Sequence, residues 1–334
     1  MKLRGVNLGG WLVLERWMTP ALFDGTDAID EHSLLHTKDA AKRLRHHHKT
    51  FIQEEDFRWM QANGINAIRI PVGYWIFEGD GPYIPSISRL DWVFLMAKKY
   101  QIQVLICLHG APGSQNGRDH SGRVGRANWY RSAEYRTETI ACLEKLARRY
   151  RDHPQLWGIE LLNEPKIGIL QWKLRRFYNQ AYRRLITILH PRTKIVFHDA
   201  FTPRMLSAAI WESPVHPVVM DIHWYHFGFI LHKWLPLRYY WKLVVWHGYL
   251  IQRLQRWQGV IIGEFSSVLS HESLRRYPEA MHTGLLADHL ARQLVAYRHA
   301  DGWFYWTYKT QDRGAWNFRS LVEDGMLPSD WMEQ

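Results

Sequence analysis

The sequence is poor in cysteine and has no long apolar run. Cys107 and Cys142 are the only cysteines among 334 residues. They do not form a disulfide framework, so the composition is compatible with a reducing compartment. No run of about 18 apolar residues is present, which argues against a membrane-spanning helix. The chain opens on strand-like residues rather than a signal peptide, so we expect a cytoplasmic protein unless a leader has been removed.

Acidic residues are also scarce, and their distribution is uneven. The chain has 43 Lys and Arg against 32 Asp and Glu, a formal net charge of +11. No nucleic-acid-binding motif accompanies this charge, so we expect no nucleic-acid partner. Residues 222–263 contain no acid at all. Their basic and aromatic residues include Lys233, Arg238, Lys242, Arg253, Arg256, Trp224, Trp234, Trp241, Trp246 and Trp257.

Two interpretations of residues 222–263 are open. The first is a long loop followed by a basic amphipathic helix packed on the fold. The second is a basic and aromatic lip that contacts an acidic polysaccharide or an anionic membrane surface.

Strand-like and helix-like segments alternate along the whole chain, and this alternation predicts an α/β fold with parallel strands. We expect strands near 3–8, 65–71, 103–109, 156–163, 194–199, 218–223, 259–264 and 302–307. Helical periodicity covers 51–63, 88–100, 133–151, 170–189, 203–209, 243–258 and 283–299. Eight strands are the number that closes a (β/α)8 TIM barrel. No linker or repeat divides the chain, so we expect residues 1–334 to form a single catalytic domain.

Two of the expected strands end in a glutamate. Glu164 follows an apolar run and precedes Pro165, and Glu264 ends the run that begins at Val260. The carboxyl ends of barrel strands meet at one rim, where a desolvated glutamate needs a partner or a proton. Acid-assisted cleavage of a glycosidic bond requires two such carboxyl groups. The acid must hold a proton near neutral pH, whereas the nucleophile must stay ionised.

Other expected strands also end in polar or aromatic side chains. Taken singly, each has a structural alternative: Arg69 could be a buried ion-pair partner, and His109 a core imidazole. Their common position at strand ends favours a site. Arg69 and Tyr225 would hold the charge of Glu264, and Asn163 would bind a substrate hydroxyl. The set comprises Asn7, Arg69, His109, Asn163, His223, Tyr225 and Trp306. Among the 18 tryptophans we expect a handful to line a cleft, since aromatic faces stack on sugars.

Seven ordered motifs between residues 4 and 309 resemble glycoside hydrolase family 5, in particular its fungal exo-β-1,3-glucanase branch. The longest is Leu108-His-Gly-Ala-Pro-Gly-Ser-Gln-Asn-Gly117. The others are Arg4-Gly-Val-Asn-Leu-Gly-Gly-Trp-Leu-Val-Leu-Glu15, Ile68-Arg-Ile-Pro-Val-Gly-Tyr-Trp75, Asn163-Glu-Pro165, Asp221-Ile-His-Trp-Tyr225, Gly263-Glu-Phe265 and Gly302-Trp-Phe-Tyr-Trp-Thr-Tyr-Lys309.

The resemblance implies a (β/α)8 barrel and a retaining double displacement without metal or cofactor. It makes Glu164 the acid/base and Glu264 the nucleophile. Arg69, His109, Asn163, His223, Tyr225 and Trp306 match the family's other active-site positions, and Glu15 matches a glutamate that touches the non-reducing-end sugar. We therefore expect an exo-β-1,3-glucanase-like enzyme acting on an oligo- or polysaccharide.

The chain departs from that branch at two positions. Arg118 stands where the branch has an aromatic residue, and His120 stands where it has an amide. Arginine prefers carboxylate or phosphate to a neutral sugar. The alternative is therefore a β-glucosidase acting on a glycolipid or an acidic bacterial exopolysaccharide.

Two other classes are weaker interpretations. One is a metal-dependent hydrolase, but His46-His47-His48 lies in a basic helical segment and is interpreted as a surface run, and His223 and His226 lack zinc-ligand spacing. The other is a sugar-binding barrel without activity, which two intact carboxylates argue against.

Overall fold

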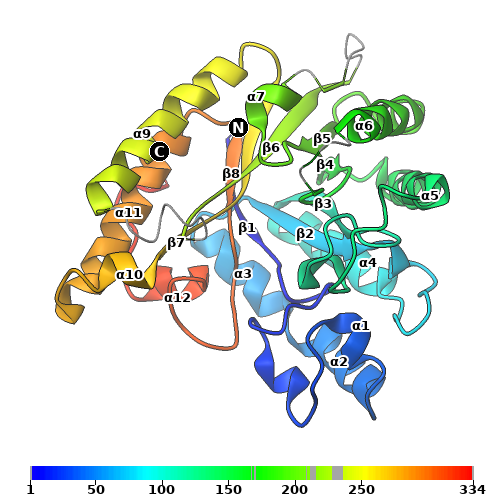
Figure 1. The fold of residues 1–334 in the computed structure, drawn as a ribbon, viewed down its shortest axis with the longest axis horizontal. Coiled ribbons are helices and arrows are strands. Elements are labelled where there is room, and N and C mark those ends of the chain that lie inside the picture. Colours follow the sequence, from blue (N-terminus) through cyan, green and yellow to red (C-terminus); the bar gives the residue numbers. More distant parts are fainter. Residues whose placement is uncertain are drawn as a thin grey trace.

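The computed structural model describes residues 2–166, 168, 171–207, 209–210, 216–227 and 236–332. Eight parallel strands form one closed barrel in the order in which they occur in the sequence, with helices packed around it (Figure 1). The expected TIM barrel is confirmed. The strands are β1 (Leu3–Asn7), β2 (Ala67–Gly73), β3 (Gln103–Gly110), β4 (Leu156–Glu160), β5 (Lys194–His198), β6 (Val218–His226), β7 (Gly259–Leu269) and β8 (Gly302–Tyr305).

The helices between strands follow the expected periodicity. They are α3 (Glu54–Ala62), α4 (Ile87–Tyr100), α5 (Ala133–Tyr150), α6 (Gln171–Leu185), α7 (Pro203–Leu206), α9 (Leu237–Leu254) and α11 (His282–Tyr297). Three short helices were not expected: α1 (Glu31–Leu34), α10 (His271–Leu274) and α12 (Phe318–Glu323). Helix α2 (Ala40–Thr50) contains the helical segment expected around His46. Helix α9 begins six residues before the expected position, and the expected start of α6 at residue 170 lies outside the described residues.

The barrel is closed at its amino-terminal end by a small apolar cluster. It contains one side chain from most strands: Leu3, Ala67, Leu105, Val196, Val219, Ile261 and Phe304. The larger core lies between the strands and the surrounding helices. The apolar runs are continuous because parallel barrel strands are covered on both faces. Because apolar side chains fill this end, the polar residues of the strands lie at the carboxyl-end rim.

The interpretation of His46-His47-His48 as a surface run is wrong for two of the three histidines. They lie in α2, and His47 and His48 are buried. Nε2 of His47 is 2.8 Å from the carbonyl of Gly10, which ties α2 to the loop after β1. Within the described part of the chain, no helix is long and apolar enough to cross a membrane.

Strand register places the polar strand ends beside one another. Asn7 of β1 pairs with Arg69 of β2, and His223 of β6 pairs with Glu264 of β7. Register shifts in β6 and β7 next to His223 and Glu264 re-aim the side chains at this end of the barrel. The topology therefore delivers residues from four strands to one spot.

Candidate active site

A pocket of about 780 Å³ opens at the carboxyl ends of the strands. It contains both strand-end glutamates, and its walls are mainly aromatic. Its lining residues are Glu15, Trp17, His109, Arg118, His120, Glu164, Phe201, Tyr225, Phe227, Glu264, Trp306 and Trp316. Three tryptophans in the wall agree with the expected handful.

The guanidinium of Arg69 is the centre of the buried polar network beneath this pocket. It is fully buried, and Nε lies 2.7 Å from Oε2 of Glu160. Its Nη1 donates to Oε1 of Glu264 over 2.9 Å and to the side chain of Asn7 over 2.9 Å. Nη2 donates to Oδ1 of Asn163 over 2.8 Å. One rigid cation thus fixes side chains from β1, β4 and β7, together with Asn163 just beyond β4.

Glu264 receives two further contacts on its other oxygen. The hydroxyl of Tyr225 donates to Oε2 over 2.8 Å, and Nδ1 of His223 lies 3.4 Å from the same atom. Together with Arg69, these groups aim the carboxylate into the pocket. Burial nevertheless raises the pKa of Glu264 to about 7, although His223 and Arg69 act in the opposite direction.

Close backbone approach explains the glycine before this glutamate. The amide of Gly263 donates to Oδ1 of Asp221 over 2.6 Å, and a Cβ atom on Gly263 would lie 2.0 Å from Oδ2 of that carboxylate. Asp221 Oδ2 is also 3.4 Å from Nε2 of His223. Only glycine leaves room for Asp221 to orient the imidazole.

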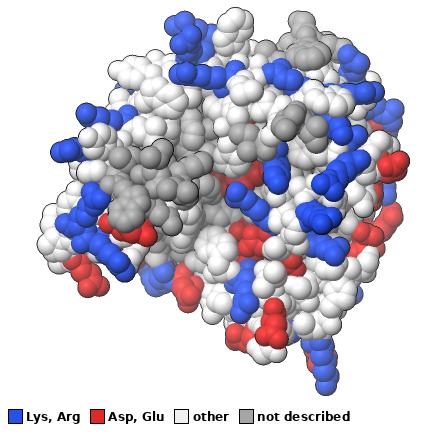
Figure 2. Space-filling model, viewed as in Figure 1, with Lys and Arg blue, Asp and Glu red and all other residues white. Residues whose placement is uncertain are grey.

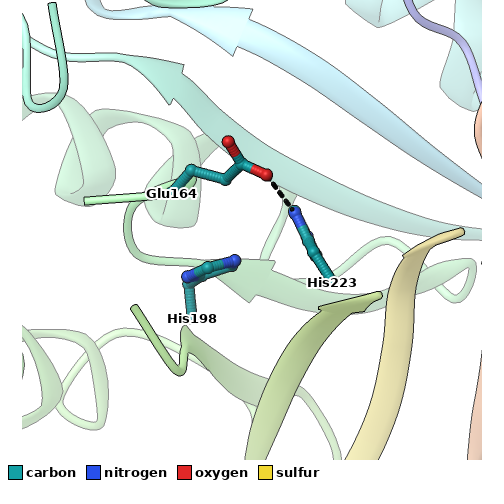
Figure 3. Close-up of side chains that lie close together, drawn as sticks. All are labelled: Glu164, His198 and His223. Atoms are coloured by element: carbon teal, nitrogen blue, oxygen red, sulfur yellow. Dashed lines mark hydrogen bonds and ion pairs between the residues drawn. The ribbon is translucent and has the colours of Figure 1, made fainter. Parts of the chain in front are cut away.

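Glu164 stands just beyond β4 on a strained backbone, with φ of +39°. Such a conformation costs on the order of 1–3 kcal/mol and persists where surrounding contacts enforce it. Asn116 donates to its carbonyl oxygen over 3.1 Å. The Glu164 side chain accepts from Nδ1 of His223 at 2.9 Å (Figure 3). Nε2 of His120 lies 3.4 Å from the second carboxylate oxygen of Glu164.

The roles of the two glutamates predict a raised pKa for the acid, Glu164, and an unraised pKa for the nucleophile, Glu264. The shifts in the structure have the opposite directions. Burial alone would raise the pKa of Glu164, but the His223 hydrogen bond and the nearby His120 hold it well below its usual range. Burial also opposes the charge of His223, yet Glu264 and Asp221 raise the pKa of this imidazole well above its usual value. The unliganded site therefore keeps its proton on Nδ1 of His223, in contact with Glu164.

His109, Asn163 and Trp306 form one wall of the pocket. The rings of His109 and Trp306 are parallel, with centroids 5.5 Å apart. Nδ2 of Asn163 lies 3.2 Å from Nε2 of His109. Burial and the charge of Arg69 lower the pKa of His109 well below its usual value, so this imidazole is neutral and can accept from Asn163.

The opposite wall carries Glu15 and an aromatic cluster. The indole of Trp17 donates to Oε2 of Glu15 over 2.8 Å, and its ring lies 5.0 Å from that of Trp316. Trp316 in turn packs against Tyr225. Arg118 lines the exposed mouth of the pocket. All the residues predicted for the site thus lie at this pocket or in the network beneath it.

Two groups of three residues offer closely spaced metal-ligand atoms within the described residues. One is Glu160, Asp221 and His223, where the guanidinium of Arg69 already supplies the positive charge. The other is Glu164, His198 and His223 (Figure 3). The amide of Ala200 donates to Nδ1 of His198 over 2.9 Å, so Nε2 of this neutral imidazole carries a proton instead of a free lone pair. Neither group fits a metal ion.

Sequence reasoning did not single out four side chains of the network. Glu160 and Asp221 lie inside the expected strands 156–163 and 218–223. The sequence around a buried acid does not indicate which cation or imidazole it will contact. His120 was noted as a departure from the family without a role. His198 ends β5, and strand-end reasoning could have found it.

The family model of cellulase (glycosyl hydrolase family 5) matches residues 36–312. A probable glucan 1,3-beta-glucosidase A of Emericella nidulans is 34% identical, with 98% of this chain and 90% of the relative covered. A glucan 1,3-beta-glucosidase of Blumeria graminis is 33% identical over 98% of this chain and 87% of the relative.

Solved structures share the fold at lower identity. A rutinosidase from Aspergillus niger has a TM-score of 0.82 at 19% identity, and 97% of each chain is covered. The endoglucanase Cel5A of Thermotoga maritima has a TM-score of 0.61 at 18% identity, with 96% of each chain covered. At these identities the similarity supports the barrel and nothing finer.

Proposed function

The chain belongs to glycosyl hydrolase family 5, and we propose that it is a retaining exo-β-1,3-glucanase with Glu264 as nucleophile and Glu164 as acid/base. The glycoside hydrolase class follows from family membership. The stereochemistry, the two roles and the linkage are our proposal.

The separation of the two carboxylates carries the stereochemical part. Oε1 of Glu164 lies 2.9 Å and Oε2 of Glu264 lies 3.4 Å from the same atom, Nδ1 of His223. The sum of these distances is an upper limit for the separation of the two oxygens. Inverting enzymes separate their two carboxyl groups by about 6.5–9.5 Å to accommodate a water, whereas retaining enzymes separate them by about 5–5.5 Å. Contact of both glutamates with one imidazole nitrogen supports the closer arrangement, in which Glu264 attacks the sugar directly.

The chemistry proceeds in two displacements. Oε2 or Oε1 of ionised Glu264 attacks the anomeric carbon while Glu164 protonates the departing glycosidic oxygen, so an ester forms and the sugar–oxygen bond breaks. Water then attacks the anomeric carbon while Glu164 removes a proton from it, and the ester bond to Glu264 breaks. Nδ1 of His223 supplies the proton that Glu164 needs at the start, across their 2.9 Å contact. Arg69 and Tyr225 hold Glu264 in line throughout.

The linkage and the exo action rest on the relatives and on the residues that line the pocket. The curated relatives carry the name glucan 1,3-beta-glucosidase. Glu15 and Trp17 line the pocket together, where a carboxylate can accept hydrogen bonds from sugar hydroxyls and an indole can cover an apolar sugar face. Neither of these relatives is named for a glycolipid or for an acidic exopolysaccharide.

Product analysis with β-1,3-, β-1,4- and β-1,6-linked gluco-oligosaccharides tests this function. We expect glucose to be released one unit at a time from the β-1,3 series, with the β-anomer formed first. Glu264→Ala should be inactive on the whole series. Release of internal fragments, first formation of the α-anomer, or preference for another linkage would each contradict the corresponding part of the proposal.

A further inference from the structure

Helix α9 carries on its outer side a strip of exposed aromatic residues and cations, here named the α9 face (Arg238, Tyr239, Lys242, Trp246, Tyr249 and Arg253). The spacing of three and four residues puts these side chains on one side of the helix. The inner side is apolar and packs on the barrel and on α11. The outer side therefore does not pack on the barrel, yet it carries large aromatic side chains between its cations.

The exposure of these aromatic side chains is large. Tyr249 is 67% exposed, Trp246 is 42% exposed, and Trp257, just after the helix, is 75% exposed. Val245 adds a further 58% exposed side chain between them. Scattered apolar residues are normal on a protein surface, but a contiguous strip of large ones marks a contact surface.

The cations of the α9 face have no acidic partner among the described residues. No ion pair joins Arg238, Lys242 or Arg253 to any carboxylate there, and residues 222–263 contain no acid. In Figure 2 the part of the surface over α9 and α7 shows Lys and Arg without Asp or Glu. The positive charge of this strip is thus not neutralised locally.

The strip is continuous with the wall of the active-site pocket through α7. The guanidinium of Arg204 lies over the ring of Trp246, 5.5 Å from its centroid. Met205, the next residue, is 60% exposed, and Phe201 of the loop before α7 lines the pocket. A surface that contacts α9 and α7 would therefore lie beside the pocket mouth.

We propose that the α9 face docks the protein on an anionic lipid bilayer, with the helix lying in the plane of the interface. Tryptophan and tyrosine are the side chains that favour the boundary between headgroups and acyl chains. Interleaved lysine and arginine add attraction to anionic headgroups. Among the exposed side chains of the helix Gln252 is the one amide, and there is no carboxylate. A sugar-binding surface instead needs carboxylates and amides around a groove, so the strip suits a flat charged surface better than a polysaccharide.

Vesicle flotation tests the proposal on the full chain. We expect the protein to float with vesicles of phosphatidylcholine mixed with phosphatidylglycerol, to stay behind with pure phosphatidylcholine, and to be released by salt. Lys242→Glu with Arg253→Glu should weaken binding at least about 25-fold, because each charge removed near the surface is worth about five-fold. Trp246→Ser with Tyr249→Ser should also weaken it.

A matched control comes from another side of the barrel. Leu95→Ser with Lys98→Glu on α4 removes one exposed apolar side chain and one exposed cation, and should leave flotation unchanged. All variants should keep the hydrolytic rate of the parent protein on soluble oligosaccharides, which shows that they are folded.

Four results would overturn the proposal. They are no flotation with anionic vesicles, flotation insensitive to the α9 variants, capture by alginate beads in place of vesicles, and a dimer that the α9 variants dissociate. Flotation is read without any hydrolysis, so failure of docking and failure of the proposed glycosidase function are separate outcomes.

Discussion

Nδ1 of His223 lies 2.9 Å from Oε1 of Glu164, within a network in which both ring nitrogens of the imidazole face carboxylates. The contact favours an ionised Glu164 and a protonated His223 in the unliganded protein. Catalysis as an acid requires the proton to cross this contact. The site can therefore be tested through the pH dependence of its rate.

Removal of the Tyr225 hydroxyl should shift the acid limb of the pH–rate profile. Glu264 has to be ionised to attack, so activity falls as the pH drops through its pKa of about 7. The hydroxyl stabilises the anion, and its loss in Tyr225→Phe raises that pKa by about one unit. We expect the acid limb of kcat/KM to move upward by that amount. An unchanged acid limb would remove Tyr225 from this role.

Replacement of His120 by an amide should shift the alkaline limb of the pH–rate profile. The alkaline limb is set by loss of the proton of the His223–Glu164 pair, which His223 holds before substrate binds. His120 lowers the pKa of Glu164 and disfavours a second cation on His223, so His120→Gln should let the pair keep its proton to higher pH, and the alkaline limb should extend upward by up to about one unit. The acid limb, set by Glu264, should hardly move, and a parallel shift of both limbs would contradict the assignment.

Loss of Arg69 should destabilise the fold in a pH-dependent manner. Arg69→Met leaves Glu160 and its neighbours as buried charges without a cation, at a cost of about 3–5 kcal/mol in the free energy of unfolding. Arg69 favours ionised carboxylates, so its contribution is present at neutral pH and fades as they become protonated. Urea unfolding at neutral and mildly acidic pH should show the deficit shrinking with acidification. Arg69→Lys, which keeps the charge, should lose less free energy of unfolding than Arg69→Met.

A methyl group at Gly263 should disturb Asp221. Because the added Cβ would lie 2.0 Å from Oδ2 of Asp221, Gly263→Ala forces this carboxylate away from His223. We expect a loss of about 1–3 kcal/mol in stability together with most of the activity. Gly284→Ala in α11 is the control, since nothing lies within 4 Å of its Cβ, and it should stabilise the helix by about 0.8–1 kcal/mol. Equal effects of the two changes on activity would contradict the close-approach argument.

The barrel and the location of its site could be predicted because both follow from a repeated pattern. Strands covered on both faces are apolar throughout, and the polar residue at each strand end then marks the rim. Glu164 and Glu264 were found by that rule. The burial of α2 was not predicted, although its buried positions Ala40, Leu44, His47 and His48 follow helical spacing. Two of these four are histidines within a basic segment, which favours a surface position over a core position.

The electrostatics of the site could not be predicted from the sequence. The pKa values of Glu164 and Glu264 depend on which oxygen faces His223, and the register shifts near the ends of β6 and β7 set that geometry. His120 comes from a single 3-10 turn (Asp119–Ser121) after β3, outside the strand pattern that marks the other site residues. The exposed side of α9 was foreseen as one of two interpretations, although Lys233 and Trp234 of the same segment lie outside the described residues.

Trapping of the glycosyl-enzyme tests the central claim most directly. A 2-deoxy-2-fluoro-β-glucoside with a dinitrophenolate leaving group slows breakdown of the intermediate more than its formation. We predict that intact-protein mass spectrometry will show one added fluoroglucosyl group with release of one dinitrophenolate, and that peptide mapping will place the ester on Glu264. An ester on another residue, or turnover to the inverted sugar without any adduct, would contradict the account.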